Sequence, residues 1–400
     1  MISARSHVLY ALCCISVLAL FVGCGGSSGS KTSSPGNNSQ AVIVNSGPPG
    51  NGGYINGLFT TVTVCAPGTS TCQPISGILV DTGSFGLRVL SSALTVSLVQ
   101  QKDVNGNSVG ECAPFANAIT WGPVKTADVK IAGEAASAIP VQVIDPNFAV
   151  IPSGCSAKGT PQEDLMGLGA NGILGVGTFI QDCGGACAVT GSSNPGFYYG
   201  CSSSSCHVIA ESASKQVQNP VAFFAGDNNG VLKDLPAVPA STATVSGSVI
   251  FGIGTQSNNS LGSAQVLTVD PNTGTFTTTF KGQSYPGFID SGSNAYFFLG
   301  SSKTGISTCP SPESAFYCPS SPAALSAKNI GFNGASNTVT FTIDNANQLF
   351  SHSGDTVLPA LSGPNPGAFD WGLPFFFGLK VYTAIETRNT PGGPGPYWAY

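Results

Sequence analysis

Two short motifs, one in each half of the chain, constrain the fold most. An apolar run ends at an aspartate, Asp81 in the first half and Asp290 in the second, and a hydroxyl residue, a glycine and a serine follow. These following residues are Thr82, Gly83 and Ser84 in the first motif and Ser291, Gly292 and Ser293 in the second. A motif that returns together with its flanking apolar strands predicts two related β lobes.

The composition favours short strands over helices. Only 8% of the residues are charged, whereas the chain holds 52 glycines and 28 prolines. Surface helices rely on Lys, Glu and Arg, which are scarce here. The 14 basic and 19 acidic residues form no basic cluster, which argues against a nucleic-acid partner. We therefore expect an all-β protein.

A second repeat lies downstream of each aspartate. An apolar pair closed by glycine occurs at 173–175, and 370–372 matches it more loosely in the second half. A strand-like stretch also precedes each aspartate, at 60–64 and 277–280. The chain is long enough for two cores. The repeats divide it into an N-terminal β lobe at 54–240, a C-terminal β lobe at 241–388 and a Pro/Gly/aromatic tail at 389–400.

The N-terminus has the features of an export signal. Arg5 precedes an apolar stretch at 8–22, which is too short for a comfortable membrane span. The residues around Cys24 resemble a bacterial lipobox. We expect residues 1–23 to be a lipoprotein signal peptide and Cys24 to be lipidated; a plain secretory signal with Cys24 incidental is the alternative.

The segment after the signal indicates how the protein is held. Residues 24–53 are rich in Gly, Ser, Asn and Pro, which predicts a flexible tether. Gly25 carries no aspartate that would retain the protein in the inner membrane. We therefore expect a protein of the bacterial cell envelope, lipid-anchored to the outer membrane on its periplasmic or surface face, with no other membrane contact.

Cysteine usage fits export. Of 13 cysteines, two leave with the signal and one carries lipid, so ten remain. An even number in an oxidising compartment indicates up to five disulfides. Spacing suggests the pairs Cys65–Cys72, Cys309–Cys318 and Cys112–Cys155, and it leaves open the pairing of Cys183, Cys187, Cys201 and Cys206. Because His207 adjoins this last cluster, a zinc site is its alternative.

With both motifs and their downstream partners in place, the chain resembles the pepsin-like aspartic peptidases over roughly residues 54–386. It looks closest to bacterial lipoproteins of unknown function that carry this signature. The resemblance implies a bilobal acid-protease fold, with two lobes related by a pseudo-twofold axis and a peptide-binding cleft between them. It also implies a monomer without a cofactor or metal.

The resemblance gives each motif residue a role. Asp81 and Asp290 would share one proton, activate a water and polarise a peptide carbonyl. Thr82 and Ser291 would bond the opposite loop, and Ser84 and Ser293 would orient the carboxylates. The glycines would let the loops approach closely. Alternatively, each aspartate merely caps a turn.

The sequence departs from the family pattern at the flap. Where family members commonly carry Tyr-Gly on a hairpin over the cleft, this chain has Trp121 and Gly122. A tryptophan often found seven positions after the first aspartate is replaced by Arg88. Trp121 and Arg88 could stack as a cation–π pair, or Trp121 could be ordinary packing.

Two functions from different classes remain. One is an aspartic endopeptidase, and the other is a pepsin-fold binding or inhibitor-like protein without turnover. A serine elbow at 106–110 lacks the preceding strand and following helix, and the aspartates are not in a setting usual for glycosidases. The intact dyad motifs favour the peptidase.

Overall fold

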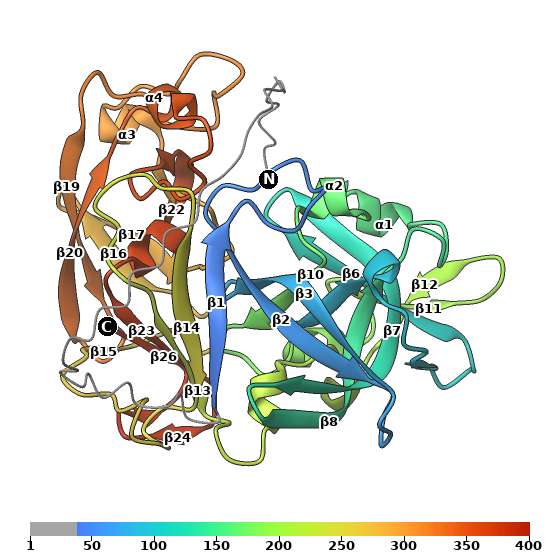
Figure 1. Cartoon of the computed structure of the whole chain (residues 1–400). Helices are drawn as coiled ribbons and strands as arrows, with labels where there is room; N and C mark the ends of the chain where they lie inside the picture. Colours follow the sequence, from blue (N-terminus) through green and yellow to red (C-terminus); the bar gives the residue numbers. More distant parts are fainter. Residues whose placement is uncertain (1–37) are drawn as a thin grey trace, which may run out of the picture.

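The computed structural model describes residues 38–400 and shows an all-β protein, as the composition predicts (Figure 1). Its four α-helices are single turns or little more. No helix within residues 38–400 is long and apolar enough to cross a membrane. The predicted signal peptide and the lipidation site Cys24 lie outside the described residues.

All thirteen strands of the first half belong to a network of 17 hydrogen-bonded strands, which β14, β15, β23 and β26 of the second half complete. They are β1 (Ser39–Asn45), β2 (Gly57–Cys65), β3 (Cys72–Asp81), β4 (Phe85–Leu90), β5 (Val99–Gln100), β6 (Ser108–Phe115), β7 (Ala118–Ile131), β8 (Glu134–Ile144), β9 (Thr160–Pro161), β10 (Gly172–Val176), β11 (Tyr198–Cys201), β12 (Cys206–Val208) and β13 (Gly230–Asp234). The helices here are α1 (Ser153–Ser156) and α2 (Leu165–Leu168), with 3-10 turns η1 (Ser91–Ala93), η2 (Gly184–Ala188), η3 (Ala213–Lys215) and η4 (Pro220–Phe223).

The second half builds a separate sheet of seven strands, in the order β20-β19-β16-β17-β22-β18-β21. Its strands are β16 (Phe276–Phe280), β17 (Gln283–Ile289), β18 (Tyr296–Leu299), β19 (Ala323–Ile330), β20 (Ser336–Ile343), β21 (Ser362–Gly363) and β22 (Asn365–Trp371). The remaining elements are β14 (Val245–Phe251), β15 (Val266–Thr268), α3 (Ser301–Thr304), α4 (Ala346–Ser351), η5 (Leu373–Phe376), β23 (Lys380–Ala384), β24 (Asn389–Thr390), β25 (Gly393–Pro394) and β26 (Tyr397–Ala399).

The same local topology surrounds each aspartate motif. In the first half β10 pairs in parallel with β3 and antiparallel with β4. In the second half β22 pairs in parallel with β17 and antiparallel with β18. The downstream apolar-Gly repeat thus lies between the two strands that flank each aspartate loop. Buried on both sides, β10 reads as a continuous apolar run rather than an alternating one.

A third group of strands joins the two halves. β1 pairs with β14, β14 with β13, β13 with β23, β23 with β26 and β26 with β15, all antiparallel. In Figure 1 these strands run between the blue-green half and the orange-red half of the molecule. Chain segments from the beginning, the middle and the end of the sequence therefore share one linking sheet.

The predicted tether and the Pro/Gly/aromatic tail both contribute a strand to this linking sheet. The tether predicted at 24–53 contains β1, whose Val42 and Val44 are buried. The tail predicted at 389–400 contains β26, in which Tyr397 and Trp398 are buried. The prediction of a flexible tether is wrong for residues 39–45, because a short apolar run flanked by Gly, Ser and Pro still gains by pairing with a neighbouring strand.

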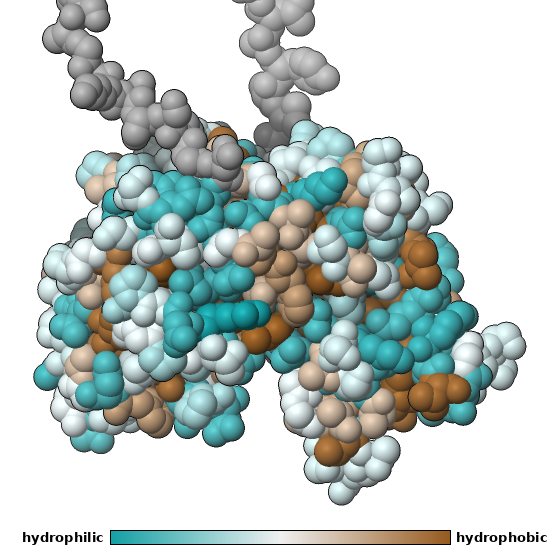
Figure 2. Space-filling model, turned by 90° about the horizontal axis from the view of Figure 1, so that it is seen from below, coloured by the Kyte–Doolittle hydropathy of each residue, from teal (hydrophilic) through white to brown (hydrophobic). Residues whose placement is uncertain are grey.

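The core is aliphatic in the first half and aromatic in the second. Around β22, rings pack in a continuous group, with the centroids of Phe298 and Phe369 5.4 Å apart and those of Phe341 and Trp371 5.3 Å apart. The surface is mostly uncharged: the face in Figure 2 shows small apolar groups among polar side chains, and its outline is notched. Such a surface follows from the low charge of the chain.

Candidate active site

Asp81 is the last residue of β3 and is held by its own loop. The backbone N–H of Gly83 donates to Asp81 Oδ1 at 2.7 Å, and the Ser84 hydroxyl donates to Oδ2 at 2.5 Å. The aspartate is only 6% exposed. Both carboxyl oxygens therefore have local donors, and the side chain has one fixed orientation.

Asp290 follows β17 and is held in the same way. Gly292 N–H donates to Asp290 Oδ1 at 2.8 Å, and the Ser293 hydroxyl lies 3.0 Å from Oδ2. Each motif thus uses the glycine amide for one oxygen and the following serine hydroxyl for the other. The two aspartates therefore have the same local hydrogen-bond pattern, as the repeated sequence predicts.

The two loops interlock through the hydroxyl residues that follow each aspartate. Thr82 Oγ1 donates to Ile289 O at 3.0 Å and accepts from Ser291 N at 2.9 Å. Ser291 Oγ donates to Val80 O at 2.8 Å. Both hydroxyls are buried. Each loop therefore satisfies backbone groups of the other half, and neither loop could keep this conformation alone.

The glycines bring the two carboxyls around one small space. A Cβ on Gly83 would lie 2.6 Å from the carboxyl carbon of Asp290. A Cβ on Gly292 would lie 2.5 Å from Asp81 Oδ1 and 3.2 Å from Asp290 Oδ1. A methyl group cannot occupy either point, so only glycine permits this approach.

Burial is the main reason why the pKa of Asp81 is raised well above its usual value, and the negative charge of Asp290 adds to the effect. Hydrogen bonds from Ser84 and Gly83 act in the opposite direction. Two carboxyls in one buried space cannot both ionise cheaply. Asp81 therefore keeps its proton to a higher pH than an exposed aspartate does.

A third carboxyl reaches the site, which sequence reasoning missed. Asp370 Oδ2 lies 2.6 Å from the Ser293 hydroxyl, which also contacts Asp290. Burial raises the pKa of Asp370 well above its usual value, and the charge of Asp290 raises it further. One sequence signal could have revealed Asp370. When 370–372 is aligned with 173–175, Asp370 takes the place of the apolar Ile173, and an acid in an apolar strand needs a polar partner.

The flap candidates Trp121 and Gly122 lie inside a strand meander. Trp121 is fully buried, and its indole N–H donates to Ala149 O at 2.9 Å. A Cβ on Gly122 would overlap the carbonyl oxygen of Val143. Both residues are packed inside the β6–β7–β8 meander. Burial of this kind fits the alternative in which Trp121 is ordinary packing, because a flap residue must be free to contact a ligand.

Arg88 makes other contacts than the stacking on Trp121 that the sequence suggests. Its guanidinium lies 5.5 Å from the ring centroid of Phe115 and pairs with two carboxylates, Glu111 at 2.5 Å and Asp182 at 3.0 Å. Tyr198 completes the group by donating to Asp182 at 2.6 Å. This buried ion cluster ties β4 to β6 and to the segment after β10.

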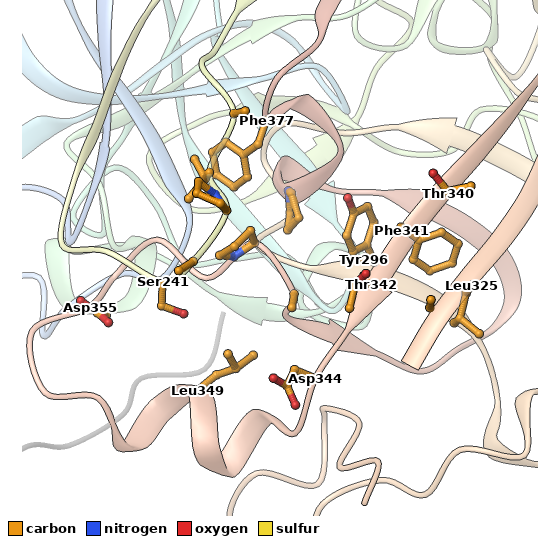
Figure 3. Close-up of a pocket in the computed structure, with 18 of the residues that line it drawn as sticks. Ser241, Tyr296, Leu325, Thr340, Phe341, Thr342, Asp344, Leu349, Asp355 and Phe377 are labelled. Atoms are coloured by element: carbon orange, nitrogen blue, oxygen red, sulfur yellow. The ribbon is translucent and has the colours of Figure 1, made fainter. Parts of the chain in front are cut away.

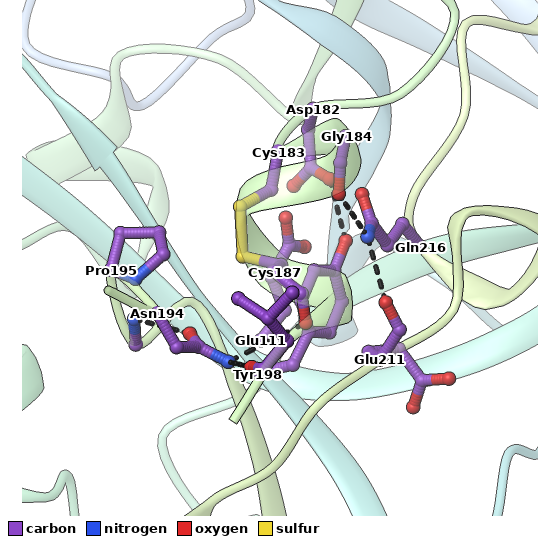
Figure 4. The surroundings of a disulfide bond; sticks show 12 residues. Glu111, Asp182, Cys183, Gly184, Cys187, Asn194, Pro195, Tyr198, Glu211 and Gln216 are labelled. Atoms are coloured by element: carbon purple, nitrogen blue, oxygen red, sulfur yellow. Dashed lines mark hydrogen bonds between the residues drawn. A yellow bond between two sulfur atoms is a disulfide. The ribbon is translucent and has the colours of Figure 1, made fainter. Parts of the chain in front are cut away.

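The ten cysteines of residues 38–400 form five disulfides. Three are the pairs that spacing suggests, and the others are Cys183–Cys187 and Cys201–Cys206. Figure 4 shows Cys183–Cys187 beside Asp182, Tyr198 and Glu111. The zinc alternative fails because these sulfurs are bonded to each other, and no group of three or more metal-ligating residues lies in the described part of the chain.

A cavity in the second half of the chain does not contain the aspartates. It has a volume of about 1110 Å³ and lies in the second half, between β20, α4 and the segment 237–241 (Figure 3). Tyr296, Phe341 and Phe377 supply aromatic walls. Neither Asp81 nor Asp290 lines this cavity, so it is distinct from the carboxyl site.

Fold and site together define an all-β protein with twin interlocked aspartate loops. The chain belongs to the family described as "Protein of unknown function (DUF3443)", whose pattern matches residues 34–400. A search of curated protein sequences found no match.

Proposed function

We propose that the protein is an exported, lipid-anchored aspartic endopeptidase of the pepsin-like type. The observation that carries the proposal is the reciprocal loop geometry, in which the glycine of each motif leaves room for the carboxyl of the other. A short motif could occur twice by chance. The hydrogen bonds that Thr82 and Ser291 each make to the loop of the other half, however, would have no role if each aspartate only capped its own turn.

The shared proton is what makes such a pair useful. A water between the two carboxyls would lose a proton to the ionised one as its oxygen attacks the peptide carbonyl carbon. The protonated carboxyl would donate to the carbonyl oxygen and so stabilise the tetrahedral intermediate. Transfer of a proton to the amide nitrogen then allows the C–N bond to break, which yields one carboxyl and one amine terminus.

Peptide or protein chains are the proposed substrates, bound between the two halves by a monomeric protein. The proposed location is the outer membrane of a bacterial envelope, through a lipid on Cys24, with no nucleic acid, metal or cofactor involved. Five disulfides fit an oxidising compartment.

A second candidate is a pepsin-fold binding protein without turnover. The observation that favours it is the burial of Trp121, because no aromatic residue of that hairpin position is free to close over the dyad. A binding protein would need the cleft but not the proton shared by the carboxyls. The two candidates therefore differ in what substitution of the aspartates does.

The test is digestion of a peptide library by the purified protein across pH 3–8, with Asp81→Asn and Asp290→Asn as paired variants. Each amide keeps the shape of the carboxyl but can neither take the water's proton nor share one, so we expect each to lower cleavage by at least ~100-fold. Asp234→Asn, which removes a partly exposed carboxylate on β13, is the matched control and should cleave normally.

Both aspartate variants should keep the wild-type fold, because asparagine preserves the local hydrogen bonds and removes like-charge repulsion. Binding of a statine-type inhibitor by wild type, weakened in both variants, would support the dyad. Absence of cleavage and of inhibitor binding in wild type, with peptide ligands bound equally by all variants, would replace the peptidase by the binding protein.

A further inference from the structure

The Ser293 hydroxyl has two carboxyl oxygens within hydrogen-bond distance but only one hydrogen to donate. Its hydroxyl oxygen lies 3.0 Å from Asp290 Oδ2 and 2.6 Å from Asp370 Oδ2, and both are hydrogen-bond distances. A serine hydroxyl carries one hydrogen and accepts through its lone pairs. If both carboxyls were ionised they would compete for this one hydrogen, and protonation of one of them removes the conflict by giving Ser293 a donor at one contact and an acceptor at the other.

The surroundings decide which of the two is neutral. Asp370 is 8% exposed, and its Oδ1 is buried without a hydrogen-bond partner. On the neighbouring strands it faces Phe288 of β17 and Phe297 of β18. An ionised carboxylate with an unpaired buried oxygen is far more costly than a neutral acid. Asp290, in contrast, receives the Gly292 amide on its second oxygen.

We propose that Asp370 is a positioning residue of the dyad: its neutral carboxylic acid donates a hydrogen bond to Ser293 Oγ, which directs the Ser293 proton onto Asp290. The inference rests on the proposed peptidase function for its catalytic meaning. The acid acts through Ser293 and does not touch the reacting atoms.

The first half has no counterpart of this acid. Ser84 bonds Asp81 alone, and the position that matches Asp370 is the apolar Ile173. The two motifs are thus alike in sequence but unequal in the strength of the donor that each serine presents. A hydroxyl that itself accepts a hydrogen bond is a better donor. The chain Asp370–Ser293 therefore favours the ionised state at Asp290 and leaves the shared proton with Asp81.

The catalytic test compares Asp370→Leu with Asp370→Asn. Leucine removes the donor and leaves Ser293 free to rotate, so kcat should fall about 10- to 100-fold, the size of one hydrogen bond to a charged group. Asparagine can donate through its amide and should recover most of this loss, to within about threefold of wild type. Ser293→Ala should match Asp370→Leu, and the double variant should be no worse than either.

Stability against pH tests the neutral acid without any need for activity. An acid whose pKa is raised by folding stabilises the folded state. This contribution is complete below the unfolded pKa of about 3.9 and is lost as pH rises towards the folded pKa. Asp370→Asn does not ionise, so its melting temperature relative to wild type should increase from pH 4 to pH 8. The charged groups acting on Asp370 are Asp290 and Asp81, which are both retained in this variant.

Parallel melting curves of wild type and Asp370→Asn would overturn the neutral acid. Cleavage abolished by asparagine but kept with leucine would overturn the positioning role. If wild type cleaves no peptide while the melting curves diverge as expected, the peptidase function and the positioning role both fail and the neutral acid stands. The two kinds of failure are therefore distinguishable.

Discussion

A buried lysine in the linking sheet offers the sharpest test of the fold energetics. Lys233 on β13 has no exposed surface. Its ammonium donates only to Thr383 Oγ1, at 3.2 Å, and lies 5.9 Å from the ring centroid of Phe376. Burial lowers the pKa of Lys233 from 10.5 to about 7, an effect that the charge of Asp81 partly opposes. We expect Lys233→Met to stabilise the protein, because methionine fills a similar volume without a charge to desolvate.

The size of the effect follows from the two pKa values. Each pKa unit corresponds to about 1.4 kcal/mol, so a protonated Lys233 costs the folded state about 5 kcal/mol relative to an unburied lysine. Below pH 7 both states bind the proton and the full cost applies. Between pH 7 and 10.5 only the unfolded state keeps the proton, so wild-type stability should rise with pH across this window.

The measurement is the unfolding free energy of wild type and Lys233→Met, by guanidinium titration with disulfides intact, from pH 5 to 10. The advantage of the methionine variant should be largest, a few kcal/mol, below pH 7 and should shrink towards pH 10. Lys328→Met, at an exposed position on β19, is the control and should change stability by less than about 0.5 kcal/mol at every pH. A constant difference between wild type and Lys233→Met across the range would refute the reasoning.

Two further substitutions test the site and the ion cluster. Gly292→Ala should separate the aspartate loops, because its Cβ would lie 2.5 Å from Asp81 Oδ1; a loss of inhibitor binding and of cleavage is expected, whereas Gly367→Ala, with open space around its Cβ, should leave both intact. Arg88→Met should lower the unfolding free energy by about 3–5 kcal/mol, since it leaves two buried carboxyls without their cation. Lys380→Met, which breaks an exposed pair, should cost less than about 1 kcal/mol, and equal effects of the two would contradict the argument.

The parts of the site that sequence predicts are those fixed by local rules. An Asp-hydroxyl-Gly-Ser loop determines its own hydrogen bonds, so the contacts of Gly83 and Ser84 with Asp81 return unchanged at Asp290. A short-range cysteine pair can also be predicted from sequence. Few residues separate Cys65 from Cys72, and a hairpin places them directly opposite each other.

What sequence did not predict depends on partners that are distant in the chain. The sequence leaves Trp121 open between a flap and ordinary packing, and its contacts with Phe148 and Tyr199 are those of a packed residue. Asp370 was taken as an imperfect apolar residue, because its relation to Ser293 arises only when β22 inserts between β17 and β18. A local pattern reports what a residue can do, while such contacts decide which of these possibilities is used.

The linking sheet makes assembly of the site depend on residues that are far apart in the chain, among them residues 397–399. β26 ends at Ala399 and fills the gap between β15 and β23, while β1 near the start pairs with β14 from the middle. Until residues 397–399 arrive, two strand edges stay open and the halves lack a complete seam. The two halves can therefore be joined completely only after residues from the beginning, the middle and the end of the described chain have all been made.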